Sequence, residues 1–329
     1  MQSQEKITKN LLNPSFYPHE TDNEIQMIET HISWVFLTGQ YVYKMKKSLK
    51  FGDILDFSTL EKRFQACKNE LFYNKRLAPS IYLDVVQIND NLELSKVGNP
   101  IEYLVKMEQL PQKDLLLNRV KKKTKLSENI FIELAKIISE FHENNTIHPE
   151  FSIYDNIYEK WDENFRTTRT YPDFPLDVNL EERVYDFLEK NKNIFNERSK
   201  HGKIVEGHGD LILANIFDFN GEIIIFDCID FNEMLRIQDI LEEVAFLAMD
   251  LDFHNLEDLS VLFLDEYLQR AASDFTSKSP MINFYKSYRA YVRAKVYYSQ
   301  VLQEEPGESR DKTVDLAKKY MNLASSYEF

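Results

Sequence analysis

The first third of the chain carries short apolar runs with the period of β-strands. Early in the chain these runs are rich in β-branched and aromatic side chains, as strands usually are. Two of them, residues 34–37 and 41–43, flank Thr38-Gly39-Gln40, which predicts a hairpin with a three-residue loop. Two later runs, residues 82–88 and 101–107, predict another pair of strands.

One helix is expected between those two strand pairs. Ser58 and Glu61 form a capping box. Pro79 marks the end of the helix, because proline cannot continue one. Apolar residues recur between these signals at spacings of three and four: Leu60, Phe64, Cys67 and Leu71.

After Pro111 the period changes to that of amphipathic helices. Residues 127–143 form a clear case, with Ser127 at the N-cap position. The one strong strand pair in this region, within residues 216–226, flanks Asn220-Gly221, the dipeptide most typical of a tight hairpin. Further helical patterns cover residues 155–167, 179–191, 239–251, 257–273, 282–303 and 311–325.

These patterns predict an α+β protein of two lobes. We expect residues 1–20 to form a polar N-terminal arm, residues 21–110 a small strand-rich lobe with one helix, and residues 111–329 a larger, mostly helical lobe. The 329 residues are 43% hydrophobic and 13% aromatic. This supplies enough apolar surface for packed cores and excludes a disordered chain.

Composition also excludes several classes of function. The 40 basic and 54 acidic residues give a net charge of −14, which argues against a protein that binds nucleic-acid phosphates. Neither a P-loop nor a G-x-G-x-x-G motif occurs, so a P-loop ATPase and a typical Rossmann domain are excluded. The two cysteines cannot form a disulfide framework. No segment resembles a signal peptide or a membrane span, so we expect a cytoplasmic protein without a membrane partner.

Polar residues flank the predicted Asn-Gly hairpin on both sides. His208-Gly209-Asp210 and Asn215 precede it, and Asp227 follows it. In a hairpin with the two-residue loop Asn220-Gly221, the numbers of two paired residues add up to 441. Asn215 is therefore expected opposite Phe226, next to Asp227. Strand alternation would direct these neighbouring side chains to opposite faces, so one end of the hairpin must leave strand geometry for both to reach one ion. Amide and carboxylate oxygens suit Mg²⁺, and Asp210, five residues before Asn215, suits phosphoryl transfer from ATP to a hydroxyl group.

This part of the sequence, HGDLILAN followed by IIIFDCIDF, resembles the aminoglycoside phosphotransferase and choline kinase superfamily, whose fold is protein-kinase-like. The resemblance implies that Asp210 is the catalytic base, that His208 supports its loop, and that Asn215 and Asp227 bind Mg²⁺. It implies ATP- and Mg²⁺-dependent transfer of the γ-phosphoryl group to a hydroxyl of a small, polar or cationic molecule. Acceptor specificity in such enzymes lies in an insert of the helical lobe, here about residues 145–200.

The likeness extends into the first lobe. Lys44 is similar to the lysine that binds the α- and β-phosphates, with Val42 above the adenine and Glu70 as its partner on the helix. Lys46 shares the alternation of Lys44 and is the alternative phosphate lysine. No glycine-rich phosphate loop is present, and Ser33 is expected to act in its place. Three consecutive residues resemble the hinge that contacts adenine: Met107, Glu108 and Gln109.

The likeness is strongest to uncharacterised bacterial members of the superfamily. Many of those carry a second, P-loop domain, which we expect to be absent here because the chain has no Walker motif. Two other functions stay open. One is a catalytically silent nucleotide-binding module, which the glycine-free phosphate loop suggests, and the other is a protein Ser/Thr kinase.

Several candidate residues also fit structural roles. Glu70 fits an ordinary surface position on its helix. Asp230 fits either a second metal ligand or a solvated loop acid, and Cys228 fits a small buried apolar residue.

Polar residues of the predicted helical lobe have similar alternatives. Asp239 with Glu242 fits a helix N-cap, and His142 fits a packing or capping position. Arg289 and Arg293 lie four residues apart on one helix face. They fit either a solvated face that pairs with carboxylates or a site for an anionic group of the substrate or a phosphate.

Overall fold

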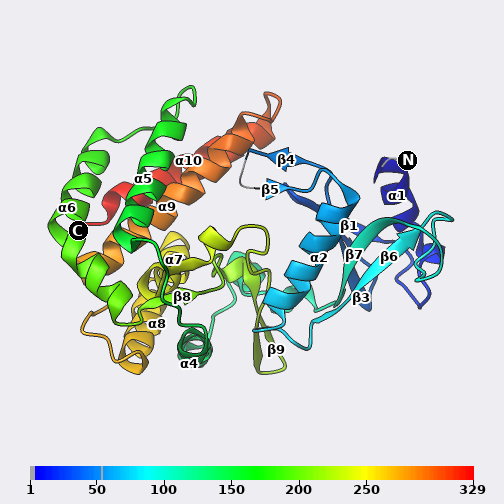
Figure 1. Cartoon of the computed structure of the whole chain (residues 1–329), viewed down its shortest axis with the longest axis horizontal. Helices are drawn as coiled ribbons and strands as arrows, with labels where there is room; N and C mark the ends of the chain where they lie inside the picture. The colour runs from blue at the N-terminus through cyan, green and yellow to red at the C-terminus, as the bar shows by residue number, and fades with distance from the viewer. Residues whose placement is uncertain (1–3, 53–54) are drawn as a thin grey trace. The chain divides into compact units, whose positions relative to one another are not determined.

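The structure is a computed structural model that describes residues 4–52 and 55–329. The chain forms two compact units (Figure 1). The first unit contains the residues up to Asn118 together with Asn215–Leu235, and the second contains Arg119–Ala214 together with Arg236–Phe329. A sheet dominates the first unit and helices dominate the second, which confirms the predicted α+β class.

The sheet of the first unit has five antiparallel strands. They are β1 Gln26–Glu29, β2 Ser33–Leu37, β3 Tyr41–Lys46, β6 Tyr82–Asn89 and β7 Pro100–Glu108, in the spatial order β1-β2-β3-β7-β6. The predicted hairpin is confirmed between β2 and β3, where Gly39 adopts a φ of +95° that suits glycine. The predicted later strand pair is confirmed as β6 and β7. A further short pair, β4 Lys50–Phe51 and β5 Leu55–Asp56, follows β3.

One core of the first unit lies against helix α1 (Gln4–Leu11). Ile7 and Leu11 of this helix are buried in a cluster with Tyr43 and Met45 of β3. The prediction of an N-terminal arm was therefore wrong for residues 4–20, which hold α1 and the short helix η1 (Pro14–Phe16). The apolar residues are few but lie four apart, which places them on one helix face. Residues 1–3 of the predicted arm lie outside the described residues.

The other core lies between the sheet and helix α2 (Leu60–Asn74), where Val42 of β3 and Cys67 of α2 share a cluster. The helix begins one residue later than predicted. Thr59 is its N-cap and accepts from the N–H of Lys62 at 3.3 Å, whereas Ser58 bonds to Asp56. The predicted apolar stripe is only partly buried, apart from Cys67. The buried face instead carries polar residues with partners on neighbouring elements, together with small ones: Arg63, Ala66, Cys67, Glu70 and Asn74.

The Asn-Gly ribbon consists of β9 (Ile216–Phe219) and β10 (Glu222–Ile225). Ile216 pairs with Ile225, which confirms the predicted register. Asn220 and Gly221 both have positive φ, 53° and 81°, as a tight hairpin turn requires. The ribbon belongs to the first unit, although the sequence placed all residues after 110 in the helical lobe. The apolar side chains of Phe217 and Ile224 explain the difference, because they pack in the cluster that contains Val42.

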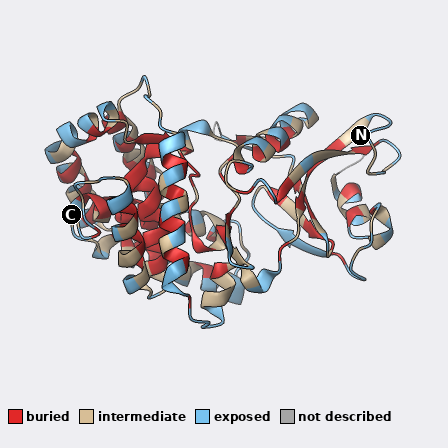
Figure 2. Ribbon diagram, turned by 90° about the horizontal axis from the view of Figure 1, so that it is seen from below, coloured by how far each residue is buried: buried red, intermediate tan, exposed pale blue. Residues whose placement is uncertain are grey.

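The second unit is built around helix α7 (Ile240–Phe253), in which Ile240–Leu251 are all buried. Figure 2 shows buried positions concentrated in the interior of this helical unit. The predicted helices are confirmed, and a short strand pair, β8 with β11, accompanies them. The other elements are α3 Leu116–Lys121, α4 Glu128–Asn144, α5 Ile153–Arg169, α6 Val178–Lys200, β8 Ile204–Glu206, β11 Ile237–Asp239, α8 Glu257–Arg270, α9 Pro280–Val301 and α10 Glu308–Ser326.

Candidate active site

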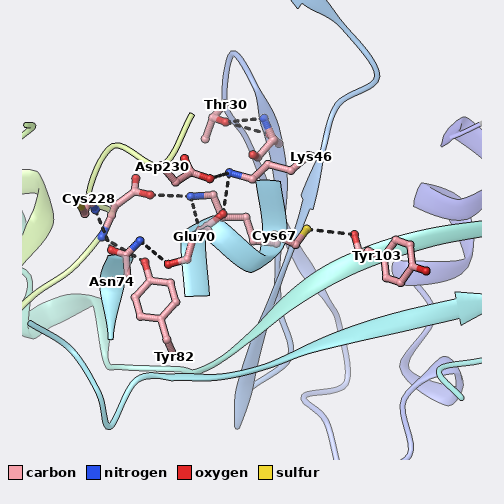
Figure 3. A network of polar contacts seen from close by, with 12 residues as sticks. Thr30, Lys46, Cys67, Glu70, Asn74, Tyr82, Tyr103, Cys228 and Asp230 are labelled. Carbon is pink, nitrogen blue, oxygen red and sulfur yellow. Dashed lines mark hydrogen bonds and ion pairs between the residues drawn. The ribbon is translucent and has the colours of Figure 1, made fainter. Parts of the chain in front are cut away.

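In the first unit, Lys44 of β3 lies between two carboxylates, one of which, Glu70, is labelled in Figure 3. Its Nζ is 2.9 Å from Glu70 Oε1 on α2 and 2.6 Å from Asp227 Oδ1, just after the ribbon. Glu70 is fully buried, so it is not the surface acid that the sequence also allowed. The structure thus joins three of the predicted nucleotide- and metal-site residues directly.

Lys46 extends this arrangement. Its Nζ lies 2.7 Å from Glu70 Oε2 and 2.6 Å from Asp230 Oδ2, so five side chains form a row of alternating charge: Asp227, Lys44, Glu70, Lys46 and Asp230. Asp230 is buried, and its interpretation as a solvated acid was wrong. Lys46 is entirely buried whereas Lys44 is 12% exposed. Of the two candidate phosphate lysines, only Lys44 combines solvent access with contact to Asp227.

Both ends of the Lys44–Glu70 pair are charged. Burial lowers the pKa of Lys44, but the carboxylates of Asp227 and Glu70 outweigh it and hold that pKa well above its usual value. Burial raises the pKa of Glu70, but Lys44 and Lys46 outweigh it and lower that pKa. A buried ion pair is sustained only when its partners are close and geometrically fixed, and Glu70 satisfies this with one oxygen for each lysine.

The backbone beside Asp227 is held by two residues that sequence reasoning missed. Its N–H donates to Tyr82 Oη at 3.1 Å, and the next N–H, of Cys228, donates to Asn74 Oδ1 at 2.7 Å. Asn74 follows Glu70 by four residues on the buried face of α2, a spacing that is visible in the sequence. Asp227 has a φ of +62°, so the chain leaves strand geometry here, as predicted for one end of the ribbon.

Asn215 begins the other side of the ribbon. Its carbonyl accepts from the N–H of Phe226 at 3.0 Å, as the predicted register requires. Among the described residues, no group of three or more His, Cys, Asp or Glu side chains is arranged to hold a metal ion. A Mg²⁺ ion at Asn215 and Asp227 would therefore have few protein ligands. Water molecules or phosphate oxygens would supply its other ligands. Asp227 fits that requirement because its side chain is 45% exposed while one oxygen bonds to Lys44.

Three of the residues predicted around the nucleotide base, Val42, Met107 and Glu108, are on adjacent strands, and Gln109 directly follows the second strand. Val42 pairs with Met107 in register, and both are buried in one apolar cluster. The next two predicted positions, Glu108 and Gln109, are tied to the backbone, because Glu108 N–H donates to Ile81 O and Gln109 Oε1 accepts from Gly39 N–H. Their contact with adenine stays a prediction.

Ser33 lies at the start of β2, in register with Lys46. Its side chain is buried, and its hydroxyl has no hydrogen-bond partner in the described part of the chain. The N–H of Ser33 donates to Thr30 Oγ1 at 2.9 Å, which closes the glycine-free turn before β2. A role of Ser33 at a phosphate stays a prediction.

In the second unit, the loop that carries Asp210 is held by helix α7. Glu243 Oε1 accepts from the N–H groups of His208 and Gly209 at 2.6 and 2.7 Å. Asp250, seven residues later on the same helix, accepts from the N–H of Leu213 at 2.8 Å. Within the loop, His208 Nδ1 accepts from the N–H of Asp210 at 3.3 Å, which fits the supporting role that the resemblance implied.

Glu243 is fixed in turn from neighbouring helices. His142 of α4 lies 2.7 Å from Glu243 Oε2, and its other ring nitrogen lies 2.6 Å from Tyr267 Oη of α8. Burial raises the pKa of Glu243, but the hydrogen bond and charge of His142 and the loop contacts outweigh it and lower the pKa to about 2. His142 is therefore a packing residue, as expected, that also orients the carboxylate beneath the loop. Gly207 is required here, because a Cβ atom at this position would overlap Glu243 Oε2.

Of the remaining polar candidates of the second unit, Asp239 and Arg289 are buried and Arg293 is partly buried. Asp239 is the N-cap of α7, as predicted, and bonds Arg198 through both oxygens. Arg289 is not on a solvated face, since it contacts Glu242 and donates to the carbonyl of Gly209 at 3.4 Å. Arg293 donates to Tyr297 Oη at 2.9 Å. Cys228, in the first unit, is buried as predicted.

Comparison with known proteins separates sequence relatives from fold relatives. No protein-family model matches the chain. Uncharacterized proteins from Mycobacterium bovis and Mycobacterium tuberculosis are 32% identical over 303 residues, which cover 90% of this chain and 59% of those proteins. The chain thus spans less than two thirds of the length of the curated relatives it matches.

Solved structures share the fold over nearly the whole chain. A choline/ethanolamine kinase family protein from Mesorhizobium loti has a TM-score of 0.58 at 10% identity, over 98% of this chain and 95% of its own. An amicoumacin kinase in complex with AMP-PNP and Ca²⁺ has a TM-score of 0.57 at 12% identity, over 98% and 94%. An aminoglycoside 2′-phosphotransferase in complex with GDP has a TM-score of 0.55 at 13% identity, over 98% and 99%.

The chain has the fold of the aminoglycoside phosphotransferase and choline kinase superfamily. Within this kinase-like fold, the predicted residues fall into two groups. Lys44, Glu70 and Asp227 are in direct contact in the first unit, whereas His208 and Asp210 belong to the loop above α7 in the second. No helix in the described residues is both long and apolar enough to cross a membrane.

Proposed function

We propose that this protein is a phosphotransferase that moves the γ-phosphoryl group of ATP, with Mg²⁺, to a hydroxyl group of a small polar molecule. The observation that carries the proposal is Lys44, held 2.9 Å from Glu70 and 2.6 Å from Asp227. A buried carboxylate that orients a lysine beside a half-exposed aspartate is an arrangement suited to a nucleotide phosphate and its metal ion.

Each group has a distinct role in this proposal. Lys44 binds the α- and β-phosphates, and Glu70 fixes its position. Asn215 and Asp227 hold Mg²⁺, which when bound neutralises charge on the phosphates. Asp210 accepts the proton of the acceptor hydroxyl, and Glu243 and Asp250 keep the loop of Asp210 rigid through three backbone N–H groups.

The fold neighbours support a small-molecule acceptor. These neighbours are described as kinases and phosphotransferases for small molecules, and two were solved with a nucleotide. Their identity to this chain is at most 13%, so they support the reaction class, and the acceptor has to come from this chain's own residues.

The test is ADP formation from ATP and Mg²⁺ over a panel of hydroxyl compounds that includes amino alcohols, hydroxy acids and sugars. We expect turnover that Asp210→Asn abolishes while AMP-PNP still raises the thermal unfolding midpoint. Asp186→Asn, which changes an exposed aspartate of α6, is the matched control and should keep full turnover.

Two results would contradict the proposal. Turnover that survives Asp210→Asn would remove this residue from the chemistry. Nucleotide binding without ADP formation over the whole panel would favour a catalytically silent module instead.

A further inference from the structure

Four polar side chains from four different elements meet inside the second unit. They are Lys160 of α5, Gln238 of β11, Glu242 of α7 and Arg289 of α9. Arg289 Nη2 lies 3.1 Å from Glu242 Oε1 and also donates to Gln238 Oε1. Lys160 Nζ lies 3.4 Å from both oxygens of Glu242. We refer to these four residues as the 160/289 cluster.

The charges of the 160/289 cluster do not balance. Two cations, Lys160 and Arg289, share one carboxylate, which leaves an excess of one positive charge. Gln238, Glu242 and Arg289 are at most 6% exposed, and the Lys160 side chain is 13% exposed. Burial and the nearby Arg289 lower the pKa of Lys160 more than Glu242 raises it. An excess charge at such a position is costly unless a counter-charge arrives.

Hydrogen bonding shows the same imbalance. Arg289 Nε and Gln238 Nε2 are buried donors without an acceptor in the described part of the chain. The amide of Gln238 cannot be turned round to remedy this, because its oxygen already accepts from Arg289. No acceptor atom of the four residues is left without a donor there. The cluster therefore lacks acceptor atoms and negative charge, and one anionic oxygen group would supply both.

The position of the cluster relates it to the loop of Asp210. Arg289 Nη1 donates to the carbonyl of Gly209 at 3.4 Å, and Gly209 directly precedes Asp210. A group bound by Arg289 would thus lie close to the peptide that positions the proposed catalytic base. Arg293 lies four residues further along α9, on the same helix face as Arg289, and adds a third cation to this part of the second unit.

We propose that the 160/289 cluster binds an anionic group, a carboxylate or a phosphate ester, of the molecule that receives the phosphoryl group. This inference rests on the proposed function and narrows it, since the sequence had suggested a polar or cationic acceptor. Lys160 and Arg289 provide the positive charge that attracts the anion, and Gln238 Nε2 provides an uncharged hydrogen-bond donor. In this role all three residues determine specificity, while Asp210 remains the base.

Anion binding is tested first, by thermal unfolding with inorganic phosphate, acetate and, as a neutral probe, glycerol at constant ionic strength. We expect phosphate or acetate to raise the midpoint in a saturable way, and Lys160→Met to weaken that binding at least about tenfold. Lys160→Arg should retain it. Lys190→Met changes an exposed lysine that pairs with Asp186 across one helix turn and should match the wild type.

Three outcomes would overturn the inference. These are an absent anion effect, an effect equal in Lys160→Met and wild type, and an effect lost in Lys44→Met but kept in Lys160→Met, which would assign the anion to the nucleotide site. None of these measurements needs phosphoryl transfer. The inference about anion binding can therefore be refuted without refuting the proposed function.

A second variant guards against misfolding of the first. Gln238→Glu places a carboxylate within the cluster at nearly unchanged volume. We expect its midpoint without added anion to equal or exceed that of the wild type, and its response to phosphate to disappear. A lower midpoint with an intact phosphate response would contradict the proposal.

The acceptor found in the turnover panel provides the last comparison. It should carry a carboxylate or a phosphate group, and Lys160→Met should raise its KM at least about tenfold, with recovery in Lys160→Arg. Matched compounds separate the two sources of charge: glycerate and glycerol 3-phosphate against glycerol and 3-amino-1,2-propanediol. Preferred turnover of an acceptor without an anionic group would refute the inference and leave the proposed function intact.

Discussion

Lys44 and Lys46 lie two residues apart on one face of β3 and bind the same carboxylate, yet their surroundings differ. Lys44 touches Asp227, whose side chain is half exposed. Lys46 has no exposed side-chain surface and lies between Glu70 and Asp230, which are both buried. Lys44 is therefore positioned to contact a ligand, whereas Lys46 maintains the position of Glu70.

Substitution of each lysine by methionine should separate these roles. Lys46→Met leaves two buried carboxylates with too little positive charge, so we expect it to lower the free energy of unfolding by about 3–5 kcal/mol. Lys44→Met should cost less stability but reduce kcat/KM for ATP at least about a hundredfold. Urea unfolding and ADP formation measure the two effects, with Lys50→Met, an exposed lysine of β4, as the control. Equal losses of stability in both variants would argue against this division.

The lowered pKa of the Glu243 carboxylate leads us to expect that the free energy of unfolding depends on pH in a specific way. Its pKa is about 2 in the folded protein against an ordinary value of 4.5. A lowered pKa contributes stability that is fully present above pH 4.5 and is lost as the pH falls toward 2. The shift corresponds to about 3 kcal/mol at neutral pH.

Glu243→Gln removes this contribution, so it should be less stable than the wild type at pH 7. The difference in unfolding free energy should shrink between about pH 5 and pH 3. Glu133→Gln, at a half-exposed position on α4, should show no such narrowing. A difference between Glu243→Gln and wild type that stays constant over this range would mean that the loop contacts do not depend on the charge of Glu243.

At the scale of elements, α7 acts as the support of the Asp210 loop. Glu243 and Asp250 lie two turns apart on the same face and bind backbone N–H groups at the two ends of the loop. The loop approaches the helix closely because residue 207 has no side chain.

Gly207→Ala should therefore disturb this support. The added methyl group would overlap Glu243 Oε2, and we expect a loss of about 1–3 kcal/mol of stability. Hydrogen exchange of the His208 and Gly209 amides should accelerate more than exchange elsewhere in the second unit. Gly307→Ala has open space around the new Cβ and should leave these amides unchanged. Unaltered protection at His208 and Gly209 in Gly207→Ala would show that the loop tolerates displacement from α7.

Element-level features were predictable where their cause is local. The Asn220-Gly221 dipeptide determined both the turn and the register, so the position of Asn215 opposite Phe226 followed from these two residues. The N-cap of α2 was missed by one residue, because Ser58 and Thr59 are both good caps and the choice depends on Asp56. Helix α1 was missed because its sequence is mostly polar and only the sheet reveals what Ile7 and Leu11 pack against.

Site residues were predictable only as far as the family motif extends. Lys44, Glu70 and Asp227 were expected, and the structure brings them into contact. Lys46 with Asp230, and Asn74 with the N–H of Cys228, are contacts between residues more than 150 positions apart. No local pattern predicts such pairs, since a buried charge and a solvated one are identical in a sequence.

At the scale of the whole molecule, the two units each contain one of the two tryptophans. Trp34 belongs to β2 in the first unit, and Trp161 is fully buried in α5 of the second. Trp161→Phe therefore leaves a fluorescence probe of the first unit, and Trp34→Phe leaves one of the second. The proposed nucleotide contacts, including Val42, Lys44 and Asp227, are residues of the first unit.

Because a ligand stabilises the state to which it binds, AMP-PNP with Mg²⁺ should raise the urea midpoint reported by Trp34 in the Trp161→Phe variant. Lys44→Met in the same background should abolish that shift, since it removes the cation that contacts the phosphates. Lys62→Met, which lies on the exposed side of α2, should preserve it. A nucleotide effect reported by Trp161 alone, or one that persists in Lys44→Met, would place binding outside the first unit and contradict the proposed function at its starting point.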